Sequence, residues 1–87
     1  MKETFFSFLV GKTIDNYNSF NGSGSRFQIS KVEDYDESIR VYPDREGHWG
    51  CFIPKKYLGM ILTNGTYTEY FSIEGCSCRE EWTLLNS

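Results

Sequence analysis

The stretch "GHWGCFIPKKYLG", Gly47–Gly59, decides how the chain is expected to fold, because two hydrophobic patterns meet at its proline. The apolar residues before Pro54 alternate, and they are Trp49, Cys51 and Ile53. Alternation with period two places these side chains on the buried face of a strand and Phe52 on the opposite face. The apolar residues after Pro54 follow helical spacing instead, and they are Tyr57, Leu58, Ile61 and Leu62.

The segment after Pro54 has two interpretations. A proline fits the first turn of a helix, where its missing N–H costs nothing, and Asn64-Gly65 is a suitable stop. Against a helix, the two lysines that follow the proline oppose the helix dipole, and Gly59 lowers helix propensity. Residues 54–62 are therefore either a short helix or a turn that leads into another strand.

Two further alternating pairs precede this stretch. They are Phe27 with Ile29, and Ile39 with Val41. We expect them to form strands that share one buried side with Gly47–Ile53, joined by hairpin turns at Glu33–Glu37 and Pro43–Gly47. Val32 falls out of phase with Phe27 and Ile29, which indicates a bulge or the end of a strand.

The remaining segments complete the expected fold. Asn16–Arg26 is rich in Asn, Ser and Gly and predicts turns or a mobile loop. Thr66–Glu74 alternates and predicts a strand, Arg79–Leu85 is a strand or one helical turn, and Lys2–Val10 is a short helix. The sum is one α+β domain over residues 1–87, a small antiparallel sheet of four to five strands with one or two short helices. A small, partly open β-barrel is the alternative.

Charge and composition exclude several classes of function. Nine basic residues against twelve acidic ones give a net charge of −3, and no basic stripe is visible, so nucleic-acid binding is not expected. The apolar run Phe5–Val10 is too short for a signal peptide or a membrane span. An odd number of cysteines, three, suits a reducing compartment. We therefore expect a cytoplasmic protein that does not enter a membrane.

One group of residues suggests a metal site. His48, Cys51, Cys76 and Cys78 make a Cys3His set on paper, and zinc binds four such ligands as a tetrahedron. On a regular strand, however, His48 and Cys51 point to opposite faces, and the other two cysteines suit a turn. We expect no metal and no cofactor, with a zinc-stabilised domain as an alternative. A catalytic Cys-His pair would need an oriented substrate site that the sequence does not show, so we expect no enzyme.

Exposed aromatics beside acids indicate a protein-binding surface. The candidate contact residues are Phe20, Asp34, Tyr35, Asp36, Tyr42 and Phe52. The leading hypothesis is a non-enzymatic acidic domain that binds a larger protein partner. Immunity proteins and phage-encoded inhibitors used against host defence have this size and charge balance, so the domain would act as an inhibitor. The alternative is a small-molecule or nucleotide-binding module, with rings around the ligand and Asn21–Ser25 as a lid.

Part of the opening stretch resembles SH3 domains. Gly47–Ile61 contains, in the order of their closing segment, Gly50, Phe52, Ile53, Pro54, Tyr57 and Leu58. The resemblance implies a small SH3-like barrel and implicates Pro54, Tyr57 and Trp49 in a groove for proline-rich peptides. The chain has no "ALYDY" opening and no paired tryptophans ahead of this stretch, so the resemblance is confined to local packing.

Overall fold

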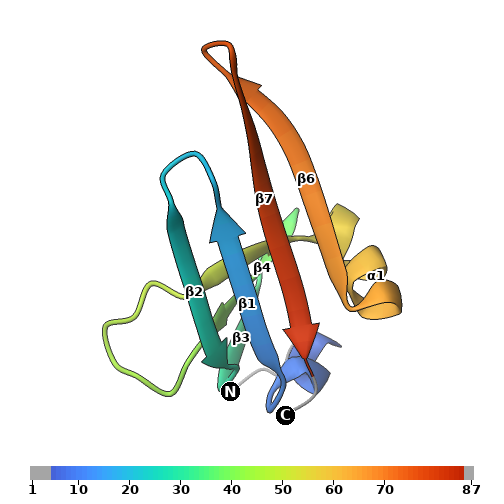
Figure 1. The fold of residues 1–87 in the computed structure, drawn as a ribbon. Helices are drawn as coiled ribbons and strands as arrows, with labels where there is room; N and C mark the ends of the chain where they lie inside the picture. The colour runs from blue at the N-terminus through green and yellow to red at the C-terminus, as the bar shows by residue number, and fades with distance from the viewer. Residues whose placement is uncertain (1–4, 86–87) are drawn as a thin grey trace.

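The computed structural model describes residues 5–85, which form seven β-strands, one α-helix and a short 3-10 helix (Figure 1). The elements are η1 (Phe5–Leu9), β1 (Thr13–Asn18), β2 (Ser23–Gln28), β3 (Lys31–Asp34), β4 (Ser38–Tyr42), β5 (Cys51–Pro54), α1 (Lys55–Asn64), β6 (Thr66–Ile73) and β7 (Cys76–Leu85). The early helix is confirmed as η1, with residues 2–4 outside the described range, and the last segment is a strand. Neither helix in residues 5–85 has the length and apolar character to cross a membrane.

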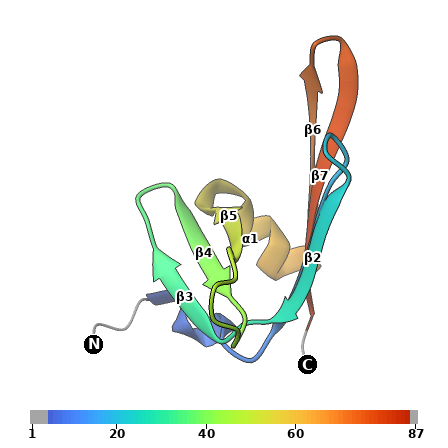
Figure 2. The ribbon, with the colours of Figure 1, turned by 90° about the vertical axis from the view of Figure 1, so that its left-hand side faces the viewer.

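The strands form two antiparallel sheets rather than the single sheet of four to five strands that we expected. One sheet has four strands in the order β2-β1-β7-β6, and the other has three in the order β3-β4-β5. Figure 2 shows the sheets edge on, with α1 between them. The protein is thus a small β-rich domain of antiparallel sheets with one α-helix.

The phase shift at Val32 marks the point where the chain changes sheets. β2 ends at Gln28, and β3 begins at Lys31 in the other sheet. Ile29 lies between them, fully buried, and its N–H donates to the carbonyl oxygen of Lys12 at 2.8 Å. Phe27 and Ile29 therefore do not share a strand, although the alternation of burial continues from one to the other.

The prediction of turns or a mobile loop at Asn16–Arg26 is correct only for a turn at residues 19–22, and the rest of the stretch is strand. Asn16–Asn18 belong to β1, which is hydrogen-bonded to β2 on one side and to β7 on the other, and only residues 19–22 turn. The pattern shows no alternation because β1 buries only Ile14, with polar side chains along the rest of the strand. Backbone ladders on both edges stabilise β1 instead of apolar burial.

The core lies between the sheets and is closed by the two helices. Its buried members are Leu9, Ile14, Ile29, Ile39, Val41, Cys51, Ile53, Leu58, Ile61 and Trp82. Each fully buried aliphatic side chain contributes about 1.5–3 kcal/mol relative to exposure. Trp82 also joins the sheets directly, because its Nε1–H donates to the carbonyl oxygen of Phe52 at 3.0 Å.

The helix after Pro54 is confirmed, and its two ends explain why it forms despite unfavourable residues. Pro54 occupies the N-cap position in an extended conformation, and Gly65 ends the helix with φ 83° and an N–H bond to the Ile61 carbonyl. No side chain caps the first turn. Instead, Lys55 donates its backbone N–H to Glu37 and forms a 2.6 Å ion pair with Asp34. This carboxylate offsets the lysine charge that opposes the dipole.

Candidate functional site

The solvent side of the three-stranded sheet gathers most of the large exposed side chains of β3, β4 and β5. We call it the aromatic face, and it consists of Glu33, Tyr35, Arg40, Tyr42 and Phe52, with the exposed Trp49 beside it in the loop before β5. Antiparallel register places Arg40 between Glu33 on one neighbouring strand and Phe52 on the other. Trp49 is 83% exposed, Phe52 51% and Tyr35 44%. The face therefore presents the rings of Tyr35 and Phe52 to solvent, with the Arg40 guanidinium group over the Phe52 ring.

Arg40 holds the centre of the aromatic face. Its guanidinium carbon lies 5.1 Å from the ring centroid of Tyr42 and 4.8 Å from that of Phe52. Its Nε donates to the carbonyl oxygen of Trp49 at 2.7 Å, which fixes the loop before β5. Cations over ring faces are attracted by the ring quadrupole. Arg40 is thus held in place by Tyr42 of its own strand, by Phe52 of the neighbouring β5 and by the loop.

Glu33 fixes the other side of the aromatic face. Its Oε1 accepts hydrogen bonds from the hydroxyls of Tyr35 at 2.7 Å and Tyr42 at 2.6 Å, and Lys31 lies 3.5 Å from Oε2. The bonds from Tyr42 and then Tyr35 lower the pKa of Glu33. Partial burial, followed by the bond to Glu33, raises the pKa of Tyr42 to about 12. At neutral pH a charged carboxylate therefore binds two neutral phenols and orients both rings.

Gly50 sets the position of Trp49, and our expectation that Trp49 is buried is wrong. Gly50 has φ 76°, and a Cβ there would lie 2.5 Å from the carbonyl oxygen of Val41. Because the chain turns at Gly50, β5 begins only at Cys51, and the alternation does not extend back to Trp49. The neighbouring His48 has a structural role: its Nδ1 accepts the Gly50 N–H at 2.9 Å, and its ring packs on Phe27.

The structure brings together half of the predicted contact residues. Tyr35, Tyr42 and Phe52 share the aromatic face, and Tyr35 and Phe52 lie 6.0 Å apart between ring centroids. Asp34 is instead engaged with Lys55, whereas Asp36 is exposed in the turn after β3.

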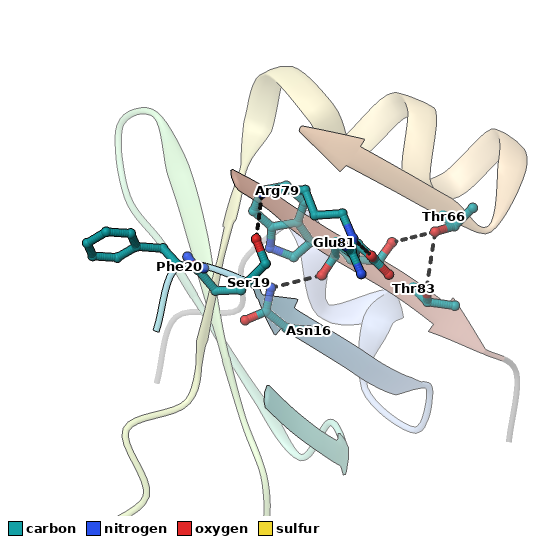
Figure 3. Close-up of polar contacts among 9 residues, drawn as sticks. Asn16, Ser19, Phe20, Thr66, Arg79, Glu81 and Thr83 are labelled. Carbon is teal, nitrogen blue, oxygen red and sulfur yellow. Dashed lines mark hydrogen bonds and ion pairs between the residues drawn. The ribbon is translucent and has the colours of Figure 1, made fainter. Parts of the chain in front are cut away.

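Phe20 lies apart from the aromatic face. It belongs to the turn between β1 and β2, is 55% exposed, and points away from the polar contacts of Asn16, Ser19 and Arg79 (Figure 3). The residues of the groove implied by the SH3 resemblance are also separated, because Tyr57 contacts the four-stranded sheet and not the aromatic face. Tyr57 stacks on Tyr67 of the four-stranded sheet at 4.4 Å and donates its hydroxyl to Glu69.

Sequence reasoning missed Arg40 and Glu33 as members of the site. Arg40 lies between Ile39 and Val41, which are both buried, so alternation alone places its side chain on the solvent side with Tyr42 and Phe52. Glu33 could be found by the same parity argument only after β3 is known to begin at Lys31. The signal for Arg40 was therefore present in the sequence.

The predicted zinc residues are not gathered into a site. Cys76 and Cys78 are strand residues of β7, not loop residues, with Cys76 exposed and Cys78 buried. Within residues 5–85, no three His, Cys, Asp or Glu side chains are placed to hold a metal ion. Cys51 is buried in the core, and this burial, with a smaller effect of Glu80, raises the pKa of its thiol to about 12.

The three thiols are expected to differ in reactivity. At about pH 8 the raised pKa keeps Cys51 protonated, and a protonated thiol is a poor nucleophile. Ellman's reagent should therefore label Cys76 quickly in the folded protein and all three cysteines after unfolding. Cys76→Ser should remove the fast phase, and Cys51→Ser should leave it unchanged. Fast labelling of Cys51, located by peptide mass spectrometry, would contradict this assignment.

The segment Asn21–Ser25, predicted as a lid, is in part a strand. Ser23–Ser25 pair with β1 as part of β2, so this segment is not a free lid. A solvent-open hollow of about 520 Å³ lies elsewhere. It is lined by Glu37, Ser38, Pro54, Lys55 and Lys56, and none of these residues is aromatic.

The aromatic face has been described from its own geometry, and no relative supplies a role for its residues. Comparisons of the chain with protein-family models, with curated proteins and with solved structures find no match.

Proposed function

We propose that this chain is a non-enzymatic protein-binding domain and that the aromatic face is its contact surface. The observation that carries the proposal is the position of Arg40, held over the rings of Tyr42 and Phe52 beside the exposed Trp49. Trp, Tyr and Arg are the residue types most enriched at the energetic centres of protein interfaces. Here Arg40 and Tyr42 lie on one side of one sheet, and the Arg40 side chain is bonded to the loop that carries Trp49.

Preorganisation supports binding at this face. The hydroxyls of Tyr35 and Tyr42 are held by Glu33, and the Arg40 side chain is held by Trp49 and two rings. Ordering a mobile side chain at an interface costs about 0.5–1.5 kcal/mol, and side chains that are already ordered avoid most of that cost. The face suits a larger protein with an apolar contact area and an acceptor for the guanidinium group.

The two acidic residues among the predicted contacts, Asp34 and Asp36, support the proposal to different degrees. Asp36 is exposed beside the aromatic face and is free to meet a basic rim on the partner. Asp34 helps to fix the start of α1 through Lys55, so its charge reversal would test the fold as well as binding. By covering a functional surface of its partner, the domain would act as an inhibitor or immunity-type protein. Its three free thiols favour a reducing compartment such as the cytoplasm.

Two phenylalanines of similar exposure provide the test. Phe52 is 51% exposed on the aromatic face, and Phe20 is 55% exposed in the distant β1–β2 turn. The partner is first isolated by affinity capture from the native host, identified by mass spectrometry, and then titrated by calorimetry. We expect Phe52→Ala to weaken binding by at least about tenfold, the loss typical of an interface hot spot. Phe20→Ala should bind as the unchanged protein does.

The stability of both variants serves as the control. Phe52→Ala removes a half-exposed ring, so thermal unfolding should change little and any loss of binding reflects the surface. Equal binding by the unchanged protein and Phe52→Ala would reject the aromatic face as the contact surface. Loss of binding in Phe20→Ala alone would transfer the site to the β1–β2 turn.

A further inference from the structure

β6 is an edge strand without the features that usually prevent strands from pairing with other chains. It has eight residues and contains no Lys, Arg, Pro or Gly. Natural edges are protected by short length, charge or coverage. The three other edges in residues 5–85 show such features: β3 has four residues with three charges, β5 has four residues with a carbonyl bound by Trp82, and β2 carries Gly24 and Arg26.

Only the first part of β6 is covered. The helix α1 packs there through Tyr57, which stacks on Tyr67 and binds Glu69. Beyond that point the strand continues with β7 as a long hairpin that extends past the rest of the molecule (Figures 1 and 2). Within residues 5–85, β7 is the only strand that pairs with β6. The free part of the edge is therefore Thr68–Ile73.

The geometry of the hairpin turn determines which backbone groups point outward. Glu74 and Gly75 have φ values of 51° and 82°, as in the type I′ turn of a two-residue hairpin. In this hairpin the flanking pair Ile73–Cys76 is hydrogen-bonded, and bonded pairs then recur at every second residue. The even-numbered residues of β6 consequently direct their N–H and C=O groups away from β7. In the free part of the edge these residues are Thr68, Tyr70 and Ser72.

We propose that the free edge of β6 pairs antiparallel with β6 of a second copy of this chain, with the two Tyr70 residues opposite each other at the twofold axis. In this register Thr68 lies opposite Ser72 of the second copy, so all three outward-pointing residues of each strand are bonded. Such a contact uses the same surface on both copies and closes as a dimer. It is separate from the aromatic face and does not depend on the function proposed above.

Charge selects this register over its neighbour. A shift that opposes Glu69 to the same residue of the second copy would place two carboxylates directly across from each other, which is destabilising. With the Tyr70 residues at the axis, Glu69 instead lies opposite Phe71, and Tyr67 lies opposite Ile73 of the second copy. The 78% exposed Tyr70 rings also gain an aromatic neighbour. The sequence of the edge is thus complementary to itself.

The expected dimer is weak. A single strand pair buries less surface than the roughly 1,200–2,000 Å² of a stable interface, so we expect association at micromolar or higher concentrations. Each copy also carries a net charge of −3, and added salt should therefore strengthen the contact by screening that repulsion. Sedimentation equilibrium from about 10 μM to 1 mM should show the mass rising from the 10.1 kDa monomer toward twice that value.

Amide hydrogen exchange locates the contact. As concentration rises, the amides of Thr68, Tyr70 and Ser72 should become protected, because they gain acceptors on the second copy. The amides of Glu69 and Phe71 already bind β7 and should not change. A monomer up to about 1 mM, or protection at other positions without change in these three, would overturn the proposal. Protection there only when another protein is added would assign the edge to that protein instead.

A charge swap tests the register. Tyr70→Lys and Tyr70→Glu each place like charges opposite each other at the axis, so each variant should associate at least about tenfold more weakly. An equal mixture of the two should form a mixed dimer, because lysine then faces glutamate. Tyr17→Lys is the matched control, since Tyr17 lies on the central strand β1, which pairs with β2 on one side and with β7 on the other and therefore has no free edge. Unchanged association of both Tyr70 variants, or no recovery in the mixture, would refute this register.

Discussion

Replacing Trp82 with alanine is expected to lower the free energy of unfolding by about 3–5 kcal/mol. Trp82 is 2% exposed at the centre of the core, lies 5.7 Å from Tyr57 between ring centroids, and donates its indole N–H to Phe52. The change leaves a large cavity and a carbonyl without its donor. A chain of 87 residues has a total stability of roughly 4–13 kcal/mol, so much of the stability would be lost. Thermal unfolding should shift down by more than about 12 °C.

Trp49 supplies the control for this prediction. It is the only other tryptophan and is 83% exposed, so Trp49→Ala should change the free energy of unfolding by no more than about 0.5 kcal/mol. Trp82→Phe separates packing from hydrogen bonding, because phenylalanine fills part of the space but cannot donate. We expect this variant to fall between the unchanged protein and Trp82→Ala. A stability loss in Trp49→Ala as large as that in Trp82→Ala would contradict the assigned core.

Gly50→Ala is expected to destabilise the protein by about 2–4 kcal/mol and to disrupt the aromatic face. The new Cβ would lie 2.5 Å from the Val41 carbonyl oxygen and 2.9 Å from the Tyr42 ring, and the backbone has φ 76°. The loop must then move, and the Trp49 carbonyl that binds Arg40 moves with it. Chemical denaturation measures the stability, and titration of the partner protein measures the effect on the face.

Gly47→Ala separates steric clash from backbone strain. Gly47 has a similar φ, 80°, but a Cβ there would meet no atom within 4 Å. Only the cost of a left-handed conformation applies, which is about 1 kcal/mol. Gly47→Ala should therefore lose less stability than Gly50→Ala and should keep full binding. Equal losses of stability in Gly47→Ala and Gly50→Ala would show that the steric clash at Gly50 makes no contribution to the destabilisation.

Strands that bury one face could be predicted from the sequence. Ile39 and Val41 alternate with polar residues, Cys51 and Ile53 are buried on either side of the exposed Phe52, and the structure pairs these two segments as neighbouring strands. The helix after Pro54 could be predicted as one of two alternatives, and the ion pair of Lys55 with Asp34 shows why the unfavourable lysine did not prevent it. A contact between residues that are distant in the sequence produces no local sequence pattern, so it could not be predicted.

Strands that depend on their neighbours could not be predicted. β1 buries only Ile14, and its position between β2 and β7 is set by hydrogen bonds to segments far away in the chain. For the same reason the second sheet was missed, since the crossing at Ile29 continues the apolar pattern of Phe27 while the chain leaves the sheet. The hydrophobic pattern indicates which residues are buried, but it does not indicate against which sheet they pack.

The candidate site was predicted in part for a similar reason. Phe52 was placed on the solvent side by parity, which the structure confirms. Trp49 was placed inside by extending the same parity across Gly50, although the positive φ of that glycine reverses the direction of the chain. A glycine next to an alternating segment should therefore be treated as a possible end of the alternation.

The bond from Trp82 to Phe52 has a consequence for how this surface can evolve. The interior of the protein uses the backbone carbonyl of residue 52, and the solvent side uses its ring. Every amino acid offers the same carbonyl, so the inner contact makes no demand on the side chain. Mutations at this position can change the exposed side chain without removing the contact that the fold uses. In a small domain with only one core, the surface can then change in sequence while the core stays intact, because the main chain of residue 52 serves the core and its side chain serves the surface.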